Sequence, residues 1–424
     1  MENRREFLRK TAYVGCLPLI GPIISAMGAD APYGKGVRIL LRSSWQTVNI
    51  GDIGHTFGIM ELFKKYLPEA EITLWPFKVN NGVDVLLKSK YPKLKIIEGN
   101  IVESKPDTPE LQHAFNQCHI MVHGSGPWVL AFKDLEAWEA TTHKPYGVYG
   151  VTLYEVDERL KKIIDQASFF YCRDTDSLKF LKSLKLKCPV QEFAPDATFA
   201  ISLSNDEKAE SYLHAKGLKK GEFICTIPRL RFTPYFQIHN TIPSELDKTN
   251  YETSMAYKEQ DAAKLREVII RWVHETGLKV LVCPEMTYQV SFSKEVLVDP
   301  LPEDVKKNVV WRDSYWNPDE AASVYRQARA LVSFEMHSPI IAFHEGTPAI
   351  HLRQPTDSRK AQMWRDIGLG EWLFEIDATT GTQIADALMK IQKNYSWAEA
   401  KMNAARKFIV SKQEMSMKTI KIFR

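Results

Sequence analysis

The sequence predicts an α/β protein made of two doubly wound, Rossmann-like domains, each built on a parallel β-sheet. Three observations support this fold class. Short apolar runs alternate with segments of helical spacing along most of the 424 residues. The alternation pauses near residues 202–206 and then starts again. The chain is also longer than one hydrophobic core usually supports, so two domains are expected.

The first predicted domain spans residues 33–204. Its apolar runs are of strand length, and the segments between them have the periodicity of amphipathic helices. The expected strands are residues 37–41, 71–75, 95–97, 120–123, 145–151 and 169–172. The expected helices are residues 56–67, 83–90, 109–116, 157–167 and 177–184. Helices that alternate with strands in this way serve as crossovers between parallel strands.

The second predicted domain spans residues 205–390 and repeats the pattern. The expected strands are residues 223–227, 279–283, 308–311, 330–333 and 348–352, and the main helices are residues 261–276 and 318–328. A polar and aromatic insert at residues 232–255 separates the first strand from the first of these helices. Residues 391–424 are expected to form a C-terminal helical segment, with an amphipathic helix at residues 397–411 that packs back across the domains.

Composition excludes several classes of function. The net charge is only +4, and the contents of 44% hydrophobic and 25% charged residues are ordinary for a globular protein. We therefore predict no nucleic-acid partner. The six cysteines form no Cys-x-x-Cys pair, and neither they nor the histidines have metal-ligand spacing. No metal site and no cofactor are predicted.

The N-terminus resembles an export signal. Paired arginines, Arg4 and Arg5, precede Phe7 and Leu8, as in twin-arginine signals, and a mildly apolar stretch follows. Prolines within that stretch disfavour a membrane-spanning helix. We predict that residues 1–29 are a signal peptide and that the mature protein is periplasmic or associated with the cell envelope.

Four polar loops follow predicted strands, at the edge of the sheet where α/β proteins bind ligands. The first contains Asn49, Gly51 and Asp52. Glycine lets a ligand approach the backbone, and the free amides of the next helix attract anions. We predict that these three residues bind substrate, although an ordinary turn would have the same composition.

The second loop contains Gly124, Ser125 and Gly126, which could form a nest of amides for a carboxylate or phosphate. A tight turn between a strand and a helix is the alternative. The loop lacks the third glycine of the dinucleotide-binding fingerprint, because position 129 is valine.

The third loop begins with Arg173 and Asp174, and Asp196 follows about twenty residues later. Asp174 is expected to cap the next helix. Arg173 is expected near the cleft as a substrate contact, with Asp196 holding it or its loop.

The fourth loop contains Glu335, His337 and Ser338 at the start of a helix in the second domain. The helix N-terminus disfavours the charged imidazole, so His337 suits a neutral base or hydrogen-bond donor. Glu335 could orient the imidazole or a substrate hydroxyl. We predict that His337 and Glu335 are catalytic and that Ser338 contacts substrate.

Taken in order, these segments resemble the polysaccharide pyruvyl transferase family. The matching segments are residues 49–52, 124–126, 172–177, 195–196, 333–338 and 346–350, and the resemblance runs from about residue 37 to residue 377. It implies a glycosyltransferase-B-like arrangement of the two domains, with the active site in the cleft between them.

The resemblance also implies an activity: transfer of an enolpyruvyl group from phosphoenolpyruvate to a sugar diol of a polysaccharide, giving a pyruvate ketal. His337 matches the family histidine that serves as acid or base. Arginines hold the donor's anionic groups in this chemistry, and Arg229, Arg231 and Arg173 are the proposed contacts. The family usually has an arginine at the position that Glu335 occupies in this sequence. The arginines that could replace its positive charge are Arg229, Arg231, Arg353 and Arg359.

Two other functions fit the same residues. The cleft could use another donor or hydrolyse a carbohydrate, with Glu335 and His337 activating water. A periplasmic glycan-binding protein without catalysis would also retain the cleft, and the many tryptophans and tyrosines suit sugar stacking.

Overall fold

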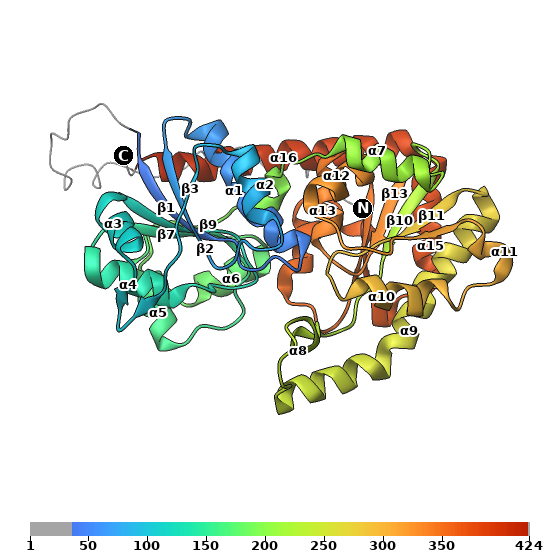
Figure 1. Cartoon of the computed structure of the whole chain (residues 1–424), viewed down its shortest axis with the longest axis horizontal. Coiled ribbons are helices and arrows are strands. Elements are labelled where there is room, and N and C mark those ends of the chain that lie inside the picture. Colours follow the sequence, from blue (N-terminus) through green and yellow to red (C-terminus); the bar gives the residue numbers. More distant parts are fainter. Residues whose placement is uncertain (1–35, 423–424) are drawn as a thin grey trace, which may run out of the picture. The chain divides into compact units, whose positions relative to one another are not determined.

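The computed structural model describes residues 36–422, so the predicted signal peptide lies outside the described residues. Within residues 36–422 no helix is both long and apolar enough to cross a membrane. Figure 1 shows two parallel sheets, each accompanied by helices, which confirms the predicted fold class. The strands of one sheet come from residues 38–193 and those of the other from residues 223–375.

The first sheet has seven strands, all parallel, and its order reverses beside β1. In spatial order the strands are β3 (Lys95–Ile96), β2 (Glu71–Pro76), β1 (Arg38–Ser43), β6 (Ile120–His123), β7 (Tyr146–Val151), β8 (Phe169–Cys172) and β9 (Gln191–Phe193). A separate antiparallel pair consists of β4 (Ile101–Val102) and β5 (Lys105–Pro106). Leu40 of β1 lies opposite Thr73 on one side and Met121 on the other. The chain leads from β1 to β2 on one side and from β6 to β7 on the other. The carboxyl ends of β1 and β6 therefore form a switch point, where such sheets bind ligands.

The helices of this half are α1 (Ile50–Tyr66), α2 (Val83–Lys90), α3 (Pro109–Gln117), α4 (Phe132–Thr142), α5 (Glu158–Gln166), α6 (Thr175–Ser183) and the short 3₁₀ turn η3 (Ala197–Ala200). Polar side chains fix several starts. Thr108, Asp157 and Asp174 each accept a hydrogen bond from an amide in the first turn of the helix that follows. Asp174 is therefore the helix cap that the sequence predicted.

The second sheet has six parallel strands in the same relative order. In space they run β12 (Val309–Trp311), β11 (Lys279–Val282), β10 (Phe223–Ile227), β13 (Ala330–Ser333), β14 (Ala349–Arg353) and β15 (Leu373–Glu375). Its switch point lies between β10 and β13.

The helices of the second half are α7 (Asp206–Ala215), α8 (Tyr235–Ile238), α9 (Glu245–Thr276), α10 (Gln289–Ser293), α11 (Glu303–Lys306), α12 (Pro318–Gln327), α13 (His337–His344), α14 (Gln362–Asp366), α15 (Gly381–Lys393) and α16 (Tyr395–Lys421). The described residues of this half also contain the short π-helix η4 (Lys294–Val298) and the 3₁₀ turns η5 (Arg359–Ala361), η6 (Gly370–Trp372) and η7 (Ile376–Ala378).

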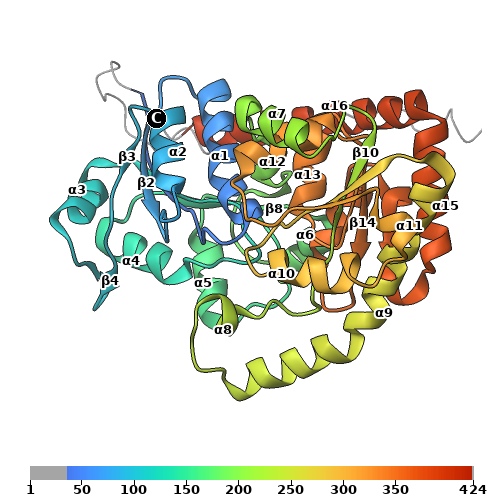
Figure 2. The same ribbon diagram turned by 45° about the vertical axis from the view of Figure 1, so that its right-hand side comes forward.

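The structure corrects the prediction of a polar and aromatic insert at residues 232–255. Much of it is helical, because α9 begins at Glu245 and runs for 32 residues instead of starting at Asp261. Ser244 and Asp247 form a reciprocal capping box that starts the helix early. Figure 2 shows that the first turns of α9 project away from the sheet. They therefore lack the apolar periodicity that predicts an amphipathic helix.

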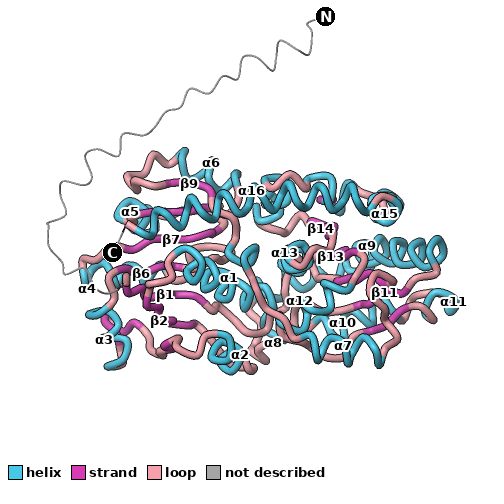
Figure 3. Tube along the Cα trace, turned by 90° about the horizontal axis from the view of Figure 1, so that it is seen from above, coloured by secondary structure: helices cyan, strands magenta, loops and turns pink. Residues whose placement is uncertain are grey.

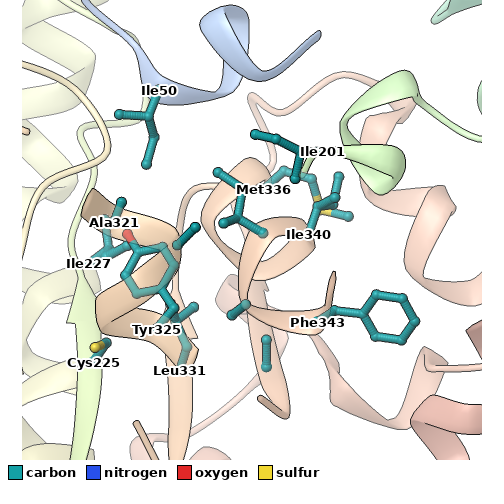
Figure 4. Packing of buried hydrophobic residues seen from close by; sticks show 14 of the residues in the cluster. Ile50, Ile201, Cys225, Ile227, Ala321, Tyr325, Leu331, Met336, Ile340 and Phe343 are labelled. Atoms are coloured by element: carbon teal, nitrogen blue, oxygen red, sulfur yellow. The ribbon is translucent and has the colours of Figure 1, made fainter. Parts of the chain in front are cut away.

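One apolar cluster spans both halves, and a second lies within the first half. Figure 4 shows Ile201 beside Met336 and Ile340 at α13, and Ile50 of α1 belongs to the same cluster. The last helix, α16, runs past both halves in Figure 3. Its end reaches the first sheet, where Tyr149 Oη lies 3.2 Å from Ser416 Oγ. The helix predicted at residues 397–411 is thus longer at both ends.

Candidate active site

A cavity of about 470 Å³ is lined by residues that follow the strands of both sheets. The lining residues are Trp45, Gln46, Asn49, Asp52, Phe77, Lys78, Pro127, Leu130 and Arg173 from the first half, and Arg229, Thr233, Tyr235, His239, Met286, Glu335, His337 and Lys360 from the second. Parallel α/β sheets bind ligands at their carboxyl ends, beside the switch points. This cavity is therefore the candidate active site.

The start of α1 shapes one wall of the cavity. Asn49 Oδ1 accepts a hydrogen bond of 2.7 Å from the amide of Gly51 and so caps the helix. Gly51 lies against the ring of His337, and a β-carbon at position 51 would overlap that ring. Asp52 faces the cavity, where it accepts a hydrogen bond from Gln46. The loop predicted to bind substrate thus contributes Asn49 and Asp52 to the lining, while Gly51 makes room for the histidine.

His337 is the first residue of α13, beside a helix N-terminus as predicted. Its Nδ1 lies 3.5 Å from Glu285 Oε1, and its ring packs edge-on against His55 with centroids 4.8 Å apart. Burial, reinforced by His55, lowers the pKa of His337 to about 3. The imidazole is therefore neutral near pH 7. Its Nε2 is buried and has no hydrogen-bond partner among residues 36–422, so this atom is free to take a proton.

Glu285 is a site residue that the sequence analysis missed. It lies in the loop after β11, two residues beyond the predicted strand 279–283, and its side chain is fully buried. Its Oε2 accepts a hydrogen bond of 2.6 Å from the amide of Ser338, which leaves Oε1 facing the imidazole of His337. A carboxylate behind a histidine orients the ring and stabilises the imidazolium that forms when the ring accepts a proton. A polar residue just after an apolar strand was the available signal.

Glu335 lies beside Arg229 in the same cavity. Its Oε1 accepts a hydrogen bond of 2.7 Å from Gln289 Nε2 and lies 3.4 Å from Arg229 Nε. Burial raises the pKa of Glu335 to about 7; Arg229 opposes this shift and Glu285 adds to it. The carboxyl group therefore exchanges its proton near physiological pH.

A second carboxylate shares the charge of Arg229. Asp357 binds Arg229 Nη1, and Lys360 Nζ lies 3.3 Å from Asp357 Oδ1. Although burial alone would raise it, the pKa of Asp357 is lowered because Arg229 and Lys360 hold its charged form. Lys360 lines the cavity and was not predicted from the sequence. It lies beyond the strand end, where no motif marked it.

A buried network lies beneath His337. Asp196 Oδ1 is 3.0 Å from His55 Nδ1, and Asp196 Oδ2 accepts a hydrogen bond of 2.7 Å from Arg173 Nη1. Despite burial, the His55 and Arg173 contacts hold the pKa of Asp196 well below its usual range. Asp196 thus holds Arg173, as the sequence suggested, and Arg173 also lines the cavity.

The same network contains ligand types that metals favour. One donor atom each from His55, Asp196 and His337 lies within 4.8 Å of the others. Both carboxylate oxygens of Asp196 already pair with side chains of this chain, namely His55 and Arg173. The trio therefore does not offer three free ligand atoms, and we assign it no metal.

Comparison with known proteins identifies the family. A model of the polysaccharide pyruvyl transferase family matches residues 49–354, which is more than half of the chain and includes the helix starts at Asn49 and His337. The chain belongs to this family. Its members are carbohydrate-modifying transferases, and this chain is one of them. No curated protein matched the sequence.

Solved structures share the fold with this pyruvyl transferase family member. A putative UDP-N-acetylglucosamine 2-epimerase from Listeria monocytogenes aligns with a TM-score of 0.58 at 11% identity, covering 87% of this chain and 91% of that one. A glycosyltransferase from Rickettsia africae gives 0.56 at 11% identity, covering 92% and 98%. The E. coli ADP-heptose heptosyltransferase II gives 0.51 at 13% identity, covering 85% and 99%. These likenesses support the glycosyltransferase-B-like arrangement.

The glycine loop of this family member is structural. Ser125 Oγ accepts a hydrogen bond from the amide of Ala197, and the Ser125 carbonyl accepts one of 2.6 Å from Trp45 Nε1. A β-carbon at Gly124 would lie 2.8 Å from Ser43 Oγ, and one at Gly126 would lie 3.0 Å from Trp45 Nε1. Neither these glycines nor Ser125 lines the cavity. The contacts of this loop are internal, and one of them holds Trp45 in place.

Ser338, predicted to contact substrate, also lies outside the cavity lining. Its hydroxyl lies 3.1 Å from Tyr325 Oη, and its amide donates a hydrogen bond to Glu285.

Most of the candidate replacement arginines point elsewhere. Arg231 pairs with Asp261 at 2.9 Å and with Asp377. Arg353 pairs with Glu375 at 3.0 Å, and Arg359 donates to the carbonyls of Leu153 and Asp176. Arg229 alone of the four lines the cavity.

Proposed function

We propose that this family member transfers the enolpyruvyl group of phosphoenolpyruvate to two hydroxyls of a cell-envelope polysaccharide. The observation that supports this most is the pairing of Glu335 and His337 in one cavity. Burial raises the pKa of the carboxyl to about 7 and lowers that of the imidazole to about 3. Groups whose environments separate their pKa values in this way suit opposite proton-transfer roles.

The reaction needs both roles. A proton adds to the methylene carbon of phosphoenolpyruvate, which becomes the ketal methyl group. One sugar hydroxyl adds to the central carbon and loses its proton. The second hydroxyl then displaces phosphate by breaking the bond between carbon and oxygen. Of the two hydroxyl protons, one in effect ends on the methyl group and the other on the departing phosphate.

Glu335 in its protonated form is the proposed acid, and neutral His337 is the proposed base. Nε2 of His337 accepts the hydroxyl proton, and Glu285 stabilises the resulting imidazolium through Nδ1. From the sequence, His337 is predicted to act as both acid and base, with Glu335 orienting it or the acceptor. The opposite directions of the two pKa shifts favour dividing the roles.

A second candidate is a hydrolase or a transferase with another donor. The charge of Arg229 is already matched by Asp357 and Glu335, which favours a less anionic donor. A non-catalytic glycan-binding role would rely on Trp45, Phe77 and Tyr235, the aromatic side chains of the lining. We also propose that the chain is exported through its twin-arginine signal, so that either activity would take place at the envelope.

The activity test compares phosphate release from phosphoenolpyruvate with and without polysaccharide. His337→Ala is expected to lower acceptor-dependent release by at least ~100-fold, since one proton-transfer group contributes about that much. His274→Ala is the matched control, because His274 also pairs with a carboxylate, Asp304 at 2.9 Å, but on the surface. Full activity of a folded His337→Ala protein would remove this histidine from the mechanism. Phosphate release that needs no acceptor would favour the hydrolase.

A further inference from the structure

The Glu335 carboxyl group is held through one of its two oxygens. Oε1 is fixed by Gln289 at 2.7 Å and faces Arg229 at 3.4 Å. Among residues 36–422, no hydrogen bond to Oε2 is found, although the side chain lines the cavity. Glu335 is only 3% exposed, so a charge on it is poorly solvated. One oxygen of a buried carboxyl group is thus available to a ligand.

The charges around Glu335 almost cancel. Arg229 and Lys360 are the cations that act on it, and Asp357 and Glu285 are the acids. Two phenols, Tyr288 and Tyr235, also face it, and burial raises the pKa of each, that of Tyr235 to about 12. With Arg229 and Lys360 charged and Asp357 and Glu285 ionised, the subsite is neutral when Glu335 is protonated and carries one net negative charge when Glu335 is ionised.

We propose that the cavity binds an anionic donor, a carboxylate or phosphate ester, together with one proton on Glu335. The neutral carboxyl group then donates a hydrogen bond from Oε2 to the anion, while Arg229 and Lys360 supply the positive charge. The proton comes from solvent and no bond to the donor forms. This inference rests on the proposed function, because it explains how an anionic donor binds where the family arginine is absent.

The sign of the pH dependence follows from linkage. A free carboxyl group with a pKa of about 7 loses its proton as pH rises above 7, and the ionised form repels an anion. The binding-competent fraction therefore falls with increasing pH. Between pH 7 and pH 9 that fraction drops roughly 50-fold, and the apparent dissociation constant rises by the same factor. A phosphate ester is already mostly dianionic above pH 7, so its own ionisation adds little.

The test is isothermal titration calorimetry of the full-length protein with phosphoenolpyruvate and, separately, with sulfate, which does not titrate in this range. In wild type we expect a roughly 50-fold loss of affinity between pH 7 and pH 9. Buffers of different ionisation enthalpy should show close to one proton taken up per anion at pH 8.5. Glu335→Gln keeps the shape without the charge, so it should bind independently of pH and roughly 30-fold more tightly than wild type at pH 8.5.

Glu375→Gln is the matched control, because Glu375 also pairs with arginines, Arg353 and Arg365, but does not line the cavity. It should retain the wild-type pH dependence. Equal affinity of wild type for phosphoenolpyruvate at pH 7 and pH 9 would overturn the proton linkage and leave the donor intact. Linked binding of sulfate without binding of phosphoenolpyruvate would support the subsite and reject the donor. Failure of both anions to bind at pH 7 would overturn the inference.

Discussion

At the scale of single residues, burial rather than sequence motif sets the chemistry of the cavity. The same loss of solvent raises the pKa of Glu335 to about 7 and lowers that of His337 to about 3. Both neutral forms are favoured, so a proton donor and a proton acceptor coexist near pH 7. Glu285 Oε1 lies 3.5 Å from Nδ1 of this acceptor, His337.

Gly51 is predicted to be essential because of its neighbour. A β-carbon there would overlap the His337 ring, which packs against the start of α1. Gly51→Ala should therefore shift the imidazole and lower kcat by at least ~10-fold, as small displacements of catalytic groups do. Gly346→Ala is the control: its φ of 91° makes alanine strained, but no atom of residues 36–422 lies within 4 Å of an added β-carbon. Steady-state kinetics and thermal unfolding of both variants would separate the effects. Equal kcat losses in the two variants would show that strain alone is responsible.

Part of this site could be predicted from the sequence. Asn49, Asp52, Arg173, Arg229, Glu335 and His337 were chosen because they follow apolar strands, and all six line the cavity. The glycine loop and Arg231 follow strands too, yet they make only internal contacts. Strand ends place a residue at the correct edge of the sheet, but the direction of its side chain depends on tertiary neighbours that one sequence does not reveal.

At the scale of elements, α16 links the two halves. Trp397 near its start packs edge-on against Trp372 with centroids 6.0 Å apart, and Ser416 near its end contacts Tyr149. The sequence predicted a shorter amphipathic helix because the polar Gln413 and Ser416 interrupt its apolar stripe, although both are buried. Buried polar residues obscure a pattern based on hydrophobicity alone.

Two methionines of α16 test that contact. Met417 is 1% exposed and Met415 is 60% exposed, so the same substitution probes opposite faces of one helix. Met417→Ala should lower the free energy of unfolding by about 2–5 kcal/mol, because it removes buried apolar volume. Met415→Ala should change it by less than about 0.5 kcal/mol. Urea unfolding followed by circular dichroism measures both values. Similar losses for the two variants would contradict the packing of α16.

At the scale of the whole molecule, the site exists only because two sheets with the same strand order meet. Each sheet provides a switch point, and the cavity draws its lining from both. The alternation of strands and crossover helices predicted the two parallel sheets, and the family resemblance implied their arrangement around a cleft. It did not predict the early start of α9 or the edge strand β15, since projecting helices and short edge strands carry little apolar signal.

The central claim is that this family member forms a pyruvate ketal. The most direct measurement incubates the purified protein with envelope polysaccharide and phosphoenolpyruvate labelled with ¹³C at its methylene carbon, followed by NMR of the recovered glycan. We predict that the label appears as a ketal methyl group, together with an equal amount of phosphate, and that His337→Ala gives neither. Release of phosphate without label on the glycan, or equal labelling by His337→Ala, would contradict the account.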